Sequence, residues 1–432
     1  MAAAPRPWRK GGWMLAAMAL CLTTFAFGAR AADISVAAGP LAPAVARAAP
    51  GDRLILLPGN HRGPVVLDRS IILEGRPGAV VSGSGQGSVI KVTASGVTVR
   101  GLTIRGSGRR TRDFDAAIYV AEGVDRFTAQ NNWLDGNLFG VALRHAQRVR
   151  IEGNRIDNRS DAYEADLGDG VFLTGVHGGA VVGNHIHGGR DGIFSEVSDH
   201  LLIGGNRIQG VRFAIHYMYT NQTRILGNLS AHNRLGFALM YSNGIDVERN
   251  LSVDDVRYGL MLHSTNHSVV AGNWLRGAHE IGLFVYTAAK NVIRGNRIED
   301  CPLGLHFSGS SLDNEVYGNA FVNNRTQVKY TGTAYDEWSK NGRGNYWSDN
   351  TAFDLKGDGV AATAYRPNSV MDRVLWRTPL ARLLMDSPVM EALRFAQSQF
   401  PALMPGGVID SHPLMAPPAL PPDLPTLNEA GS

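Results

Sequence analysis

Cysteine is almost absent from this chain, which has only Cys21 and Cys301 among its 432 residues. Cys21 lies inside an apolar run near the N-terminus, so Cys301 stands alone in the rest of the chain. This scarcity excludes an intramolecular disulfide framework in the folded part. If the chain enters an oxidising compartment, its fold must be stabilised by burial and not by cross-links.

Long hydrophobic runs are also lacking, apart from one at about residues 13–27. Arg9 and Lys10 precede this run and Ala29-Arg30-Ala31 follows it, which is the order of a secretory signal peptide. We therefore predict that residues 1–31 form an export signal. The run is shorter than the ~20 residues of a typical membrane span, and an uncleaved anchor is the alternative.

A surplus of basic charge disappears once this signal is set aside. The whole chain carries 42 basic and 38 acidic residues. Residues 1–31 hold four basic side chains and no acidic one, so 38 of each sign remain. A neutral chain without a basic run argues against nucleic acid as the partner.

What the chain does contain is a repeat of 22 or 23 residues, marked by asparagine that usually follows glycine. Three residues before each marker from Asn154 to Asn319 stands valine or isoleucine, in eight repeats out of eight. Such β-branched side chains suit a pleated, buried surface. We interpret the asparagines as a structural ladder at a tight bend, where asparagine tolerates left-handed conformations. The markers are Asn132, Asn154, Asn184, Asn206, Asn228, Asn250, Asn273, Asn296, Asn319 and Asn345.

This repeat predicts an all-β solenoid, a right-handed parallel β-helix of 22–23-residue rungs over residues 32–350. A leucine-rich repeat is disfavoured because its leucine consensus is absent. A short capping helix is expected at residues 41–48, before the first rung, and insertions at residues 106–113 and 158–167. Residues 351–416 are expected to form a loop and apolar helices, one of them opened by Ser387-Pro388. The Pro-rich residues 417–432 are expected to be disordered.

Methionine is scarce too, and between the signal and Val370 there are only Met218, Met240 and Met261. Strand alternation places outward side chains of successive rungs in two columns. The first column reads Ala142, Phe172, Phe194, His216, Ala238, Met261, Phe284 and His306. The second column reads Arg144, Thr174, Glu196, Met218, Met240, His263, Tyr286 and Ser308.

The second column thus stacks Met218, Met240 and His263, with His216 and Met261 beside them and Ala238 leaving room between. Thioether and imidazole ligands select Cu(I) over Zn, Mg or Ca. We therefore predict a copper site, with Cu(I) as cofactor, made of these three residues together with His216 and Met261. Two alternatives are ordinary gap-filling by methionine and an apolar patch for protein docking.

A different alternative rests on Asp169 and Asp191, which share another column on adjacent rungs. Stacked carboxylates suit an acid–base pair for sugar hydrolysis or calcium ligands of a lyase, so a carbohydrate-binding or carbohydrate-cleaving protein is the alternative function. We favour corner polar residues instead, because no Lys or Arg cluster completes a catalytic set.

The export signal, the Gly-Asn-x-Ile rungs, the closing element Gly344-Asn345-Tyr346-Trp347-Ser348-Asp349 and the rung His216-Tyr217-Met218-Tyr219-Thr220 together resemble the NosD family. The resemblance covers essentially the whole mature chain. It implies a periplasmic accessory protein that works with an ABC transporter made of an ATPase and a membrane permease. The apolar C-terminal helices are then candidates for docking on the permease, close to the inner membrane.

The resemblance also implies a client, because NosD proteins help to assemble the copper centre of nitrous oxide reductase. Combined with the soft ligands, it predicts a non-enzymatic copper chaperone that donates Cu(I) to the apo-reductase by ligand exchange. A metal-free scaffold that only bridges transporter and client is the remaining alternative.

Overall fold

The computed structural model describes residues 31–332, 334–369, 372, 376, 378, 380, 387–399 and 407–427. The predicted signal at residues 1–31 lies almost wholly outside the described residues, as does most of the apolar segment from residue 370 to residue 386. None of the helices within the described ranges has the length and apolar character needed to span a membrane.

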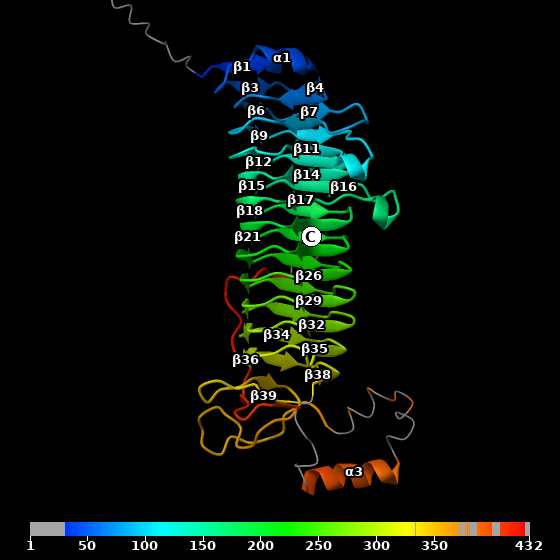
Figure 1. The fold of residues 1–432 in the computed structure, drawn as a ribbon, viewed down its shortest axis with the longest axis vertical. Coiled ribbons are helices and arrows are strands. Elements are labelled where there is room, and N and C mark those ends of the chain that lie inside the picture. The colour runs from blue at the N-terminus through cyan, green and yellow to red at the C-terminus, as the bar shows by residue number, and fades with distance from the viewer. Residues whose placement is uncertain are drawn as a thin grey trace, which may run out of the picture. The chain divides into compact units, whose positions relative to one another are not determined.

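Residues from Asp33 to Trp347 form a parallel β-solenoid of about 14 turns, in which each regular turn adds one strand to each of three sheets (Figure 1). The first sheet, sheet A, contains β1 (Asp33–Val36), β3 (Arg53–Leu56), β6 (Ile72–Gly75), β9 (Thr98–Arg100), β12 (Thr128–Gln130), β15 (Gln147–Glu152), β18 (His177–Val182), β21 (Asp199–Gly204), β24 (Thr223–Leu226), β27 (Ile245–Glu248), β30 (Val269–Ala271), β33 (Val292–Arg294) and β36 (Glu315–Tyr317).

The other two sheets follow the same stacking. Sheet B contains β2 (Gly39–Pro40), β4 (Gly59–Arg62), β7 (Ala79–Ser82), β10 (Thr103–Arg105), β13 (Trp133–Asn137), β16 (Arg155–Asn158), β19 (His185–His187), β22 (Arg207–Gln209), β25 (Leu229–Ala231), β28 (Leu251–Val253), β31 (Trp274–Arg276), β34 (Arg297–Glu299), β37 (Ala320–Val322) and β40 (Tyr346–Trp347). Sheet C contains β5 (Val65–Leu67), β8 (Ile90–Val92), β11 (Ala116–Val120), β14 (Phe139–Arg144), β17 (Val171–Thr174), β20 (Asp191–Glu196), β23 (Phe213–Met218), β26 (Leu235–Met240), β29 (Tyr258–His263), β32 (Ile281–Tyr286), β35 (Leu303–Phe307) and β38 (Thr326–Tyr330).

The interior is built from the β-branched column that the repeat predicts. Val247, Val270 and Ile293 are register partners on successive strands of sheet A, and each is buried. A turn cannot bury such a face alone, so each turn depends on its neighbours for its core. The predicted β-solenoid is confirmed, and its rungs follow the predicted repeat.

The asparagine ladder is confirmed as a chain of buried hydrogen bonds. Asn228 Oδ1 accepts from the backbone N–H of Asn206 at 3.0 Å, and Asn228 Nδ2 donates to the Ile203 carbonyl at 2.9 Å and to Asn250 Oδ1 at 2.9 Å. The same pattern runs from Asn132 to Asn345. The left-handed residue at the bend is the one before the asparagine, usually glycine, for example Gly227 with φ 63°, although Asn131 and Arg249 adopt the same conformation. Asparagine therefore serves through its hydrogen bonds, and glycine is favoured before it for the backbone conformation.

The N-terminal helix α1 (Ala42–Arg47) lies where the sequence predicts a helix, but it does not precede the first rung. Strands β1 and β2 come before it, and α1 contacts β5, the first strand of sheet C. Leu41, which precedes the helix, and Val45 within it are both buried. The helix thus replaces the sheet C strand of the first turn and closes the core there.

Both predicted insertions fold back on the solenoid. The first contains the short 3-10 helix η1 (Thr111–Asp113), followed by Phe114, whose ring lies 4.9 Å from that of Phe172 on the outer face of sheet C. The second contains η2 (Glu164–Asp166), where Glu164 Oε2 pairs with Arg234 Nη1 at 3.3 Å. The outer face of sheet C is therefore partly covered by these loops.

The C-terminal region closes the other end. Strand β39 (Tyr335–Glu337) pairs in parallel with β41 (Gly407–Ile409). The Asp410 carboxylate accepts from the backbone N–H of Asn345 at 2.7 Å and from Trp347 Nε1 at 2.8 Å, which terminates the asparagine ladder. Helix α3 (Pro388–Gln399) begins at Pro388, as the Ser387-Pro388 pair predicts.

The Pro-rich tail differs from the expected disorder over residues 417–427. Here Asp423 Oδ2 pairs with Arg249 Nη1 at 2.6 Å, and Leu427 contacts an apolar cluster with Leu229 and Leu251 on sheet B. The tail runs back along the solenoid, drawn in red in Figure 1. An ion pair and apolar contacts thus hold a segment whose composition alone favours disorder.

The ladder makes a stability prediction. Asn228→Ala leaves the buried Asn206 N–H and Ile203 carbonyl without partners, at about 1–3 kcal/mol each. We expect the free energy of unfolding to fall by about 3 kcal/mol or more, measured by urea unfolding followed by circular dichroism. Asn221→Ala, at a half-buried corner outside the ladder, serves as the control and should change the unfolding midpoint much less. Equal losses in the two variants would contradict the structural role of the ladder.

Candidate metal site

The two outward columns predicted on sheet C are present in the strand register. His216 pairs with Ala238 and Ala238 with Met261, while Met218 pairs with Met240 and Met240 with His263. These six residues form a grid of two columns on three successive turns, contributed by β23, β26 and β29. Neighbours within a column are about 5 Å apart, and neighbours across the two columns are about 6.6 Å apart along the strand. Five positions carry thioether or imidazole groups and the sixth is alanine, and we call these six residues the Met/His grid.

The grid residues differ in burial, which sequence reasoning did not predict. His216 is 8% exposed and Met261 is 6% exposed, whereas Met218, Met240 and His263 are half-buried. The outer face of sheet C thus has a second apolar layer, separate from the core inside the solenoid. Met240 and Met261 contact the cluster around Leu235 and Ala238 in this layer.

Met218 belongs to a different part of the same layer. It contacts a neighbouring cluster that contains Phe172 and Phe194, whose rings stack at 5.4 Å. The strand register still places Met218 directly beside Met240. The three methionines are therefore adjacent along the sheet, but they do not share one apolar cluster.

His216 is the grid residue with the most defined surroundings. Its Nδ1–H donates to Asp191 Oδ2 at 3.0 Å, and its ring lies edge-on to Phe194 at 5.0 Å and to Phe213 at 4.8 Å. Its other nitrogen, Nε2, is buried without a hydrogen-bond partner among the described residues. A histidine that donates one N–H to a carboxylate and leaves the other nitrogen bare is the usual arrangement of a metal ligand with its supporting carboxylate.

Asp191 is itself held in place from the other side. Arg212 donates to it through Nε at 2.8 Å and through Nη2 at 2.7 Å. Burial disfavours the charged carboxylate, but the hydrogen bonds from His216 and Arg212 outweigh burial and keep the pKa of Asp191 below its ordinary value. The carboxylate thus remains an acceptor that fixes the His216 ring.

The sequence shows no Lys or Arg cluster near Asp169 and Asp191, but the structure pairs each of them with one arginine. Arg190 donates to Asp169 through Nε and Nη2, both at 3.1 Å, on the turn before the Arg212–Asp191 pair. Each arginine lies 21 residues after its partner, on the next turn, a spacing that sequence reasoning overlooked. Because both carboxylates are buried and engaged in these pairs, neither is placed as a free acid or base.

Three exposed tyrosines flank His263, and of these the outward columns had placed only Tyr286. Tyr219 and Tyr241 stack at 5.2 Å, and the His263 ring lies 5.0 Å from Tyr241 and 5.3 Å from Tyr286. Tyr219 and Tyr241 directly follow Met218 and Met240 and have φ near 50°. These left-handed turns place the aromatic rings along the corner beside the grid, which was not readable from strand alternation.

These features define a class of protein, a parallel β-solenoid that carries thioether and imidazole side chains on one outer face. Residues 158–352 match the family model described as periplasmic copper-binding protein (NosD). A probable ABC transporter binding protein NosD of Pseudomonas aeruginosa is 43% identical over 388 residues, which are 87% of this chain and 91% of that protein. The relative from Stutzerimonas stutzeri with the same description is 39% identical over 409 residues, covering 91% and 92%. The chain belongs to the NosD family.

Solved structures support the fold alone. The surface adhesin PfbA of Streptococcus pneumoniae has a TM-score of 0.53 at 9% identity and matches 66% of this chain and 86% of its own. The DFA-IIIase of Arthrobacter chlorophenolicus without its lid has a TM-score of 0.50 at 16% identity and matches 66% and 89%. These similarities extend to the solenoid and carry no argument about the grid.

The buried carboxylates make a pH prediction. Burial and the charge of Asp191 raise the pKa of Asp169 to about 7, although Arg190 opposes this, and its ordinary value is 3.8. Between about pH 4 and pH 7 the folded chain keeps a proton that the unfolded chain releases, so stability falls as the pH rises. Asp169→Asn removes the titrating group. Between pH 5 and pH 7.5 the free energy of unfolding, measured with urea, should therefore decrease more in the wild type than in this variant. The same pH dependence in both proteins would contradict the raised pKa of Asp169.

Proposed function

We propose that this chain binds Cu(I) in the Met/His grid through Met218, Met240, Met261, His263 and His216, and donates it to a client enzyme in the periplasm. One observation carries the proposal, the buried His216 beside a grid of thioethers, whose Nε2 has no hydrogen-bond partner within the part of the chain that the structure describes. A buried ring nitrogen without a hydrogen-bond partner costs free energy. A bond from this nitrogen to a soft metal ion would compensate that cost.

The grid favours Cu(I) by the nature of its ligands. All five groups are neutral, and thioether and imidazole ligands are those that soft Cu(I) selects. A divalent hard ion would need carboxylate or carbonyl oxygens, which the grid does not provide. Ala238 is the small residue among these side chains, so its position offers the space in which flexible methionines can converge on an ion.

Asp191 and Arg212 act in this proposal as positioning residues. They orient the His216 ring and fix which nitrogen is bare, as supporting carboxylates do for metal-bound histidines. The apolar rings of Phe194 and Phe213 keep water from the ring. His216 thus moves from a supporting ligand in the sequence prediction to the anchor of the site.

The burial gradient across the grid suits transfer by ligand exchange. His216 and Met261 are buried, whereas Met218, Met240 and His263 reach the surface. An acceptor can replace the accessible ligands first and the buried ones afterwards, without a redox step. The aromatic corner of Tyr219, Tyr241 and Tyr286 stands beside the accessible ligands and offers contact area to that acceptor.

The partners follow from the family. Relatives are named as probable ABC transporter binding proteins, which supports a transporter partner with a permease and an ATPase at the inner membrane. Helix α3, with Val389 and Phe395 exposed, is the described part of the C-terminal region proposed to dock on the permease. The acceptor that the family resemblance implies is the nitrous oxide reductase apoprotein, and the chain acts on it as a binding protein and not as an enzyme.

The alternatives are less well supported. A carbohydrate-cleaving role needs free carboxylates, and Asp169 and Asp191 are engaged with Arg190 and Arg212. A metal-free scaffold accounts for the exposed aromatic corner, but it gives no reason for a bare, buried His216 nitrogen. Copper binding accounts for both features.

An anaerobic Cu(I) titration against a chromophoric chelator tests the site. The paired variant Met218→Ala with Met240→Ala should weaken Cu(I) affinity at least about 100-fold, because even supporting residues are worth about 10–100-fold. Met415→Ala, an exposed methionine outside the grid, serves as the control and should keep wild-type affinity. If the paired variant binds Cu(I) as the wild type does, the assignment of the grid fails.

A second variant tests whether the five ligands converge around Ala238, and it leaves all five in place. Ala238→Leu places a larger side chain among the five ligands, so Cu(I) binding should be lost while stability falls by about 1–3 kcal/mol from overpacking. Ala142→Leu, equally buried in the same column four turns earlier, should lose similar stability and keep its copper. Unchanged Cu(I) affinity of Ala238→Leu would show that the ligands do not converge there.

A further inference from the structure

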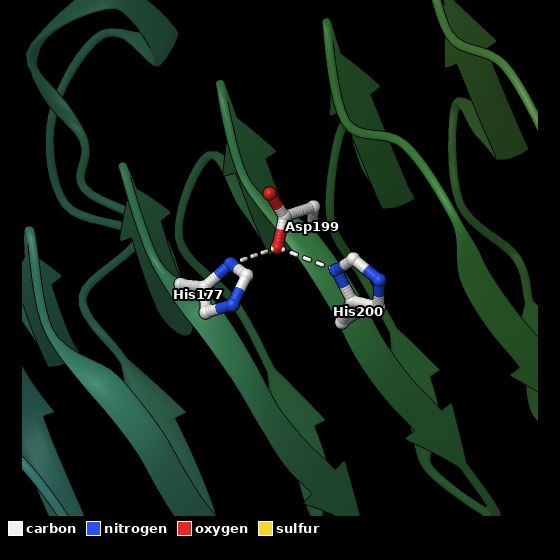
Figure 2. A group of neighbouring side chains, drawn as sticks. All are labelled: His177, Asp199 and His200. Atoms are coloured by element: carbon white, nitrogen blue, oxygen red, sulfur yellow. Dashed lines mark hydrogen bonds and ion pairs between the residues drawn. The ribbon is translucent and has the colours of Figure 1, made fainter.

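A second group of ligating side chains lies at the corner where the chain passes from sheet C to sheet A. His177 begins β18 and Asp199 begins β21, and the two residues are register partners on successive turns. His200 follows Asp199 directly. Figure 2 shows both imidazole rings turned toward the Asp199 carboxylate from the two sides.

The convergence depends on backbone conformation. Successive residues of a strand normally point to opposite faces, which would separate Asp199 from His200. His200 instead has φ 53°, a left-handed conformation that turns its side chain back toward Asp199. One turn earlier the equivalent position is Gly178, which has no side chain to occupy the space below the His200 ring. The corner thus brings together three groups that strand alternation keeps apart.

The geometry is compact. His200 Nδ1–H donates to Asp199 Oδ1 at 2.8 Å, and His177 Nδ1 forms an ion-pair contact with the same oxygen. The two rings are 5.3 Å apart at 63°, and one ligand atom from each of the three residues lies within 4.8 Å of the others. The side chains of His177, Asp199 and His200 are 63%, 39% and 55% exposed, so an ion can reach them from solvent.

We infer that His177, Asp199 and His200 form a binding site for a divalent transition-metal ion, with Cu²⁺ preferred over Zn²⁺. Two imidazole nitrogens and one carboxylate oxygen are a ligand set for either ion, and the Irving–Williams order places Cu²⁺ above Zn²⁺. An imidazole that binds the ion through Nδ1 carries its proton on Nε2. Water completes the coordination on the exposed side.

This corner site is chemically distinct from the Met/His grid and goes beyond the proposed Cu(I) function. It contains a carboxylate and no thioether, so it suits a charged ion of borderline softness and not Cu(I). It is nevertheless close in the chain, because Asp199 follows Glu196 by three residues and Glu196 is the register partner of Met218. One edge of the solenoid thus presents two sites with different preferences.

Electron paramagnetic resonance of mature, tag-free protein loaded with one equivalent of Cu²⁺ tests the inference. We expect a bound Cu²⁺ signal with couplings to two imidazole nitrogens. His177→Gln and His200→Gln should each remove one coupling and weaken Cu²⁺ binding at least about tenfold, since even a supporting residue costs that much. Asp199→Asn should weaken binding similarly. Because the three side chains are exposed, thermal unfolding of these variants should match the wild type.

The chain supplies a matched control for this experiment. His267 is an exposed histidine with φ 52° at the equivalent corner position of a later turn, but its preceding residue is Asn266 and not an acid. His267→Gln should leave the Cu²⁺ signal unchanged. All corner variants should keep Cu(I) affinity, which separates this site from the grid. If His177→Gln and His200→Gln keep the wild-type signal, or if His267→Gln removes it equally, the corner site is refuted.

Discussion

The in-register parallel stacking of turns is the constraint on which the rest of the molecule depends. It is held by a buried ladder in which each asparagine side chain satisfies backbone and side-chain groups of the neighbouring turns. Buried polar groups tolerate little change of position, because each unmade hydrogen bond costs more than a made one contributes. A slip of one residue would also turn the interior column outward. Register and core are therefore fixed together, and with them the position of every outward side chain.

This constraint turns a one-dimensional repeat into a two-dimensional arrangement of side chains. Residues 22 or 23 positions apart become neighbours at about 5 Å on the outer face of sheet C. Met218, Met240 and His263 form one column in this way, and His216 and Met261 belong to the other. In the proposed copper site, the rigid sheet would hold the ligand side chains in place and the flexible methionines would adjust to the ion. His216 and Met261 are buried in the apolar second layer, whereas Met218, Met240 and His263 are half-buried.

If both proposed sites bind their ions, one edge of the solenoid would separate metals by softness. The grid offers neutral sulfur and nitrogen ligands in a partly apolar setting, while the corner offers two nitrogens and a negative oxygen in water. In each proposed site the ligands match the ion. A negative carboxylate suits a divalent ion, and neutral thioethers suit a soft monovalent ion. The outward side chains of the sheet C strands make up the proposed Met/His grid, and the left-handed residue His200 brings together the proposed corner site.

The sequence by itself determined the period, the interior β-branched column, the asparagine ladder and the two outward columns, because all of these depend on strand alternation and a constant turn length. It also placed the five candidate ligands in adjacent positions. Only the tertiary structure decided that His216 is buried against Asp191 and Arg212, that Arg190 engages Asp169, and that residues 417–427 lie along sheet B. The same holds for the turn of His200 toward Asp199. Burial and side-chain pairing depend on loops and corners, whose backbone conformation and distant partners no periodic pattern encodes.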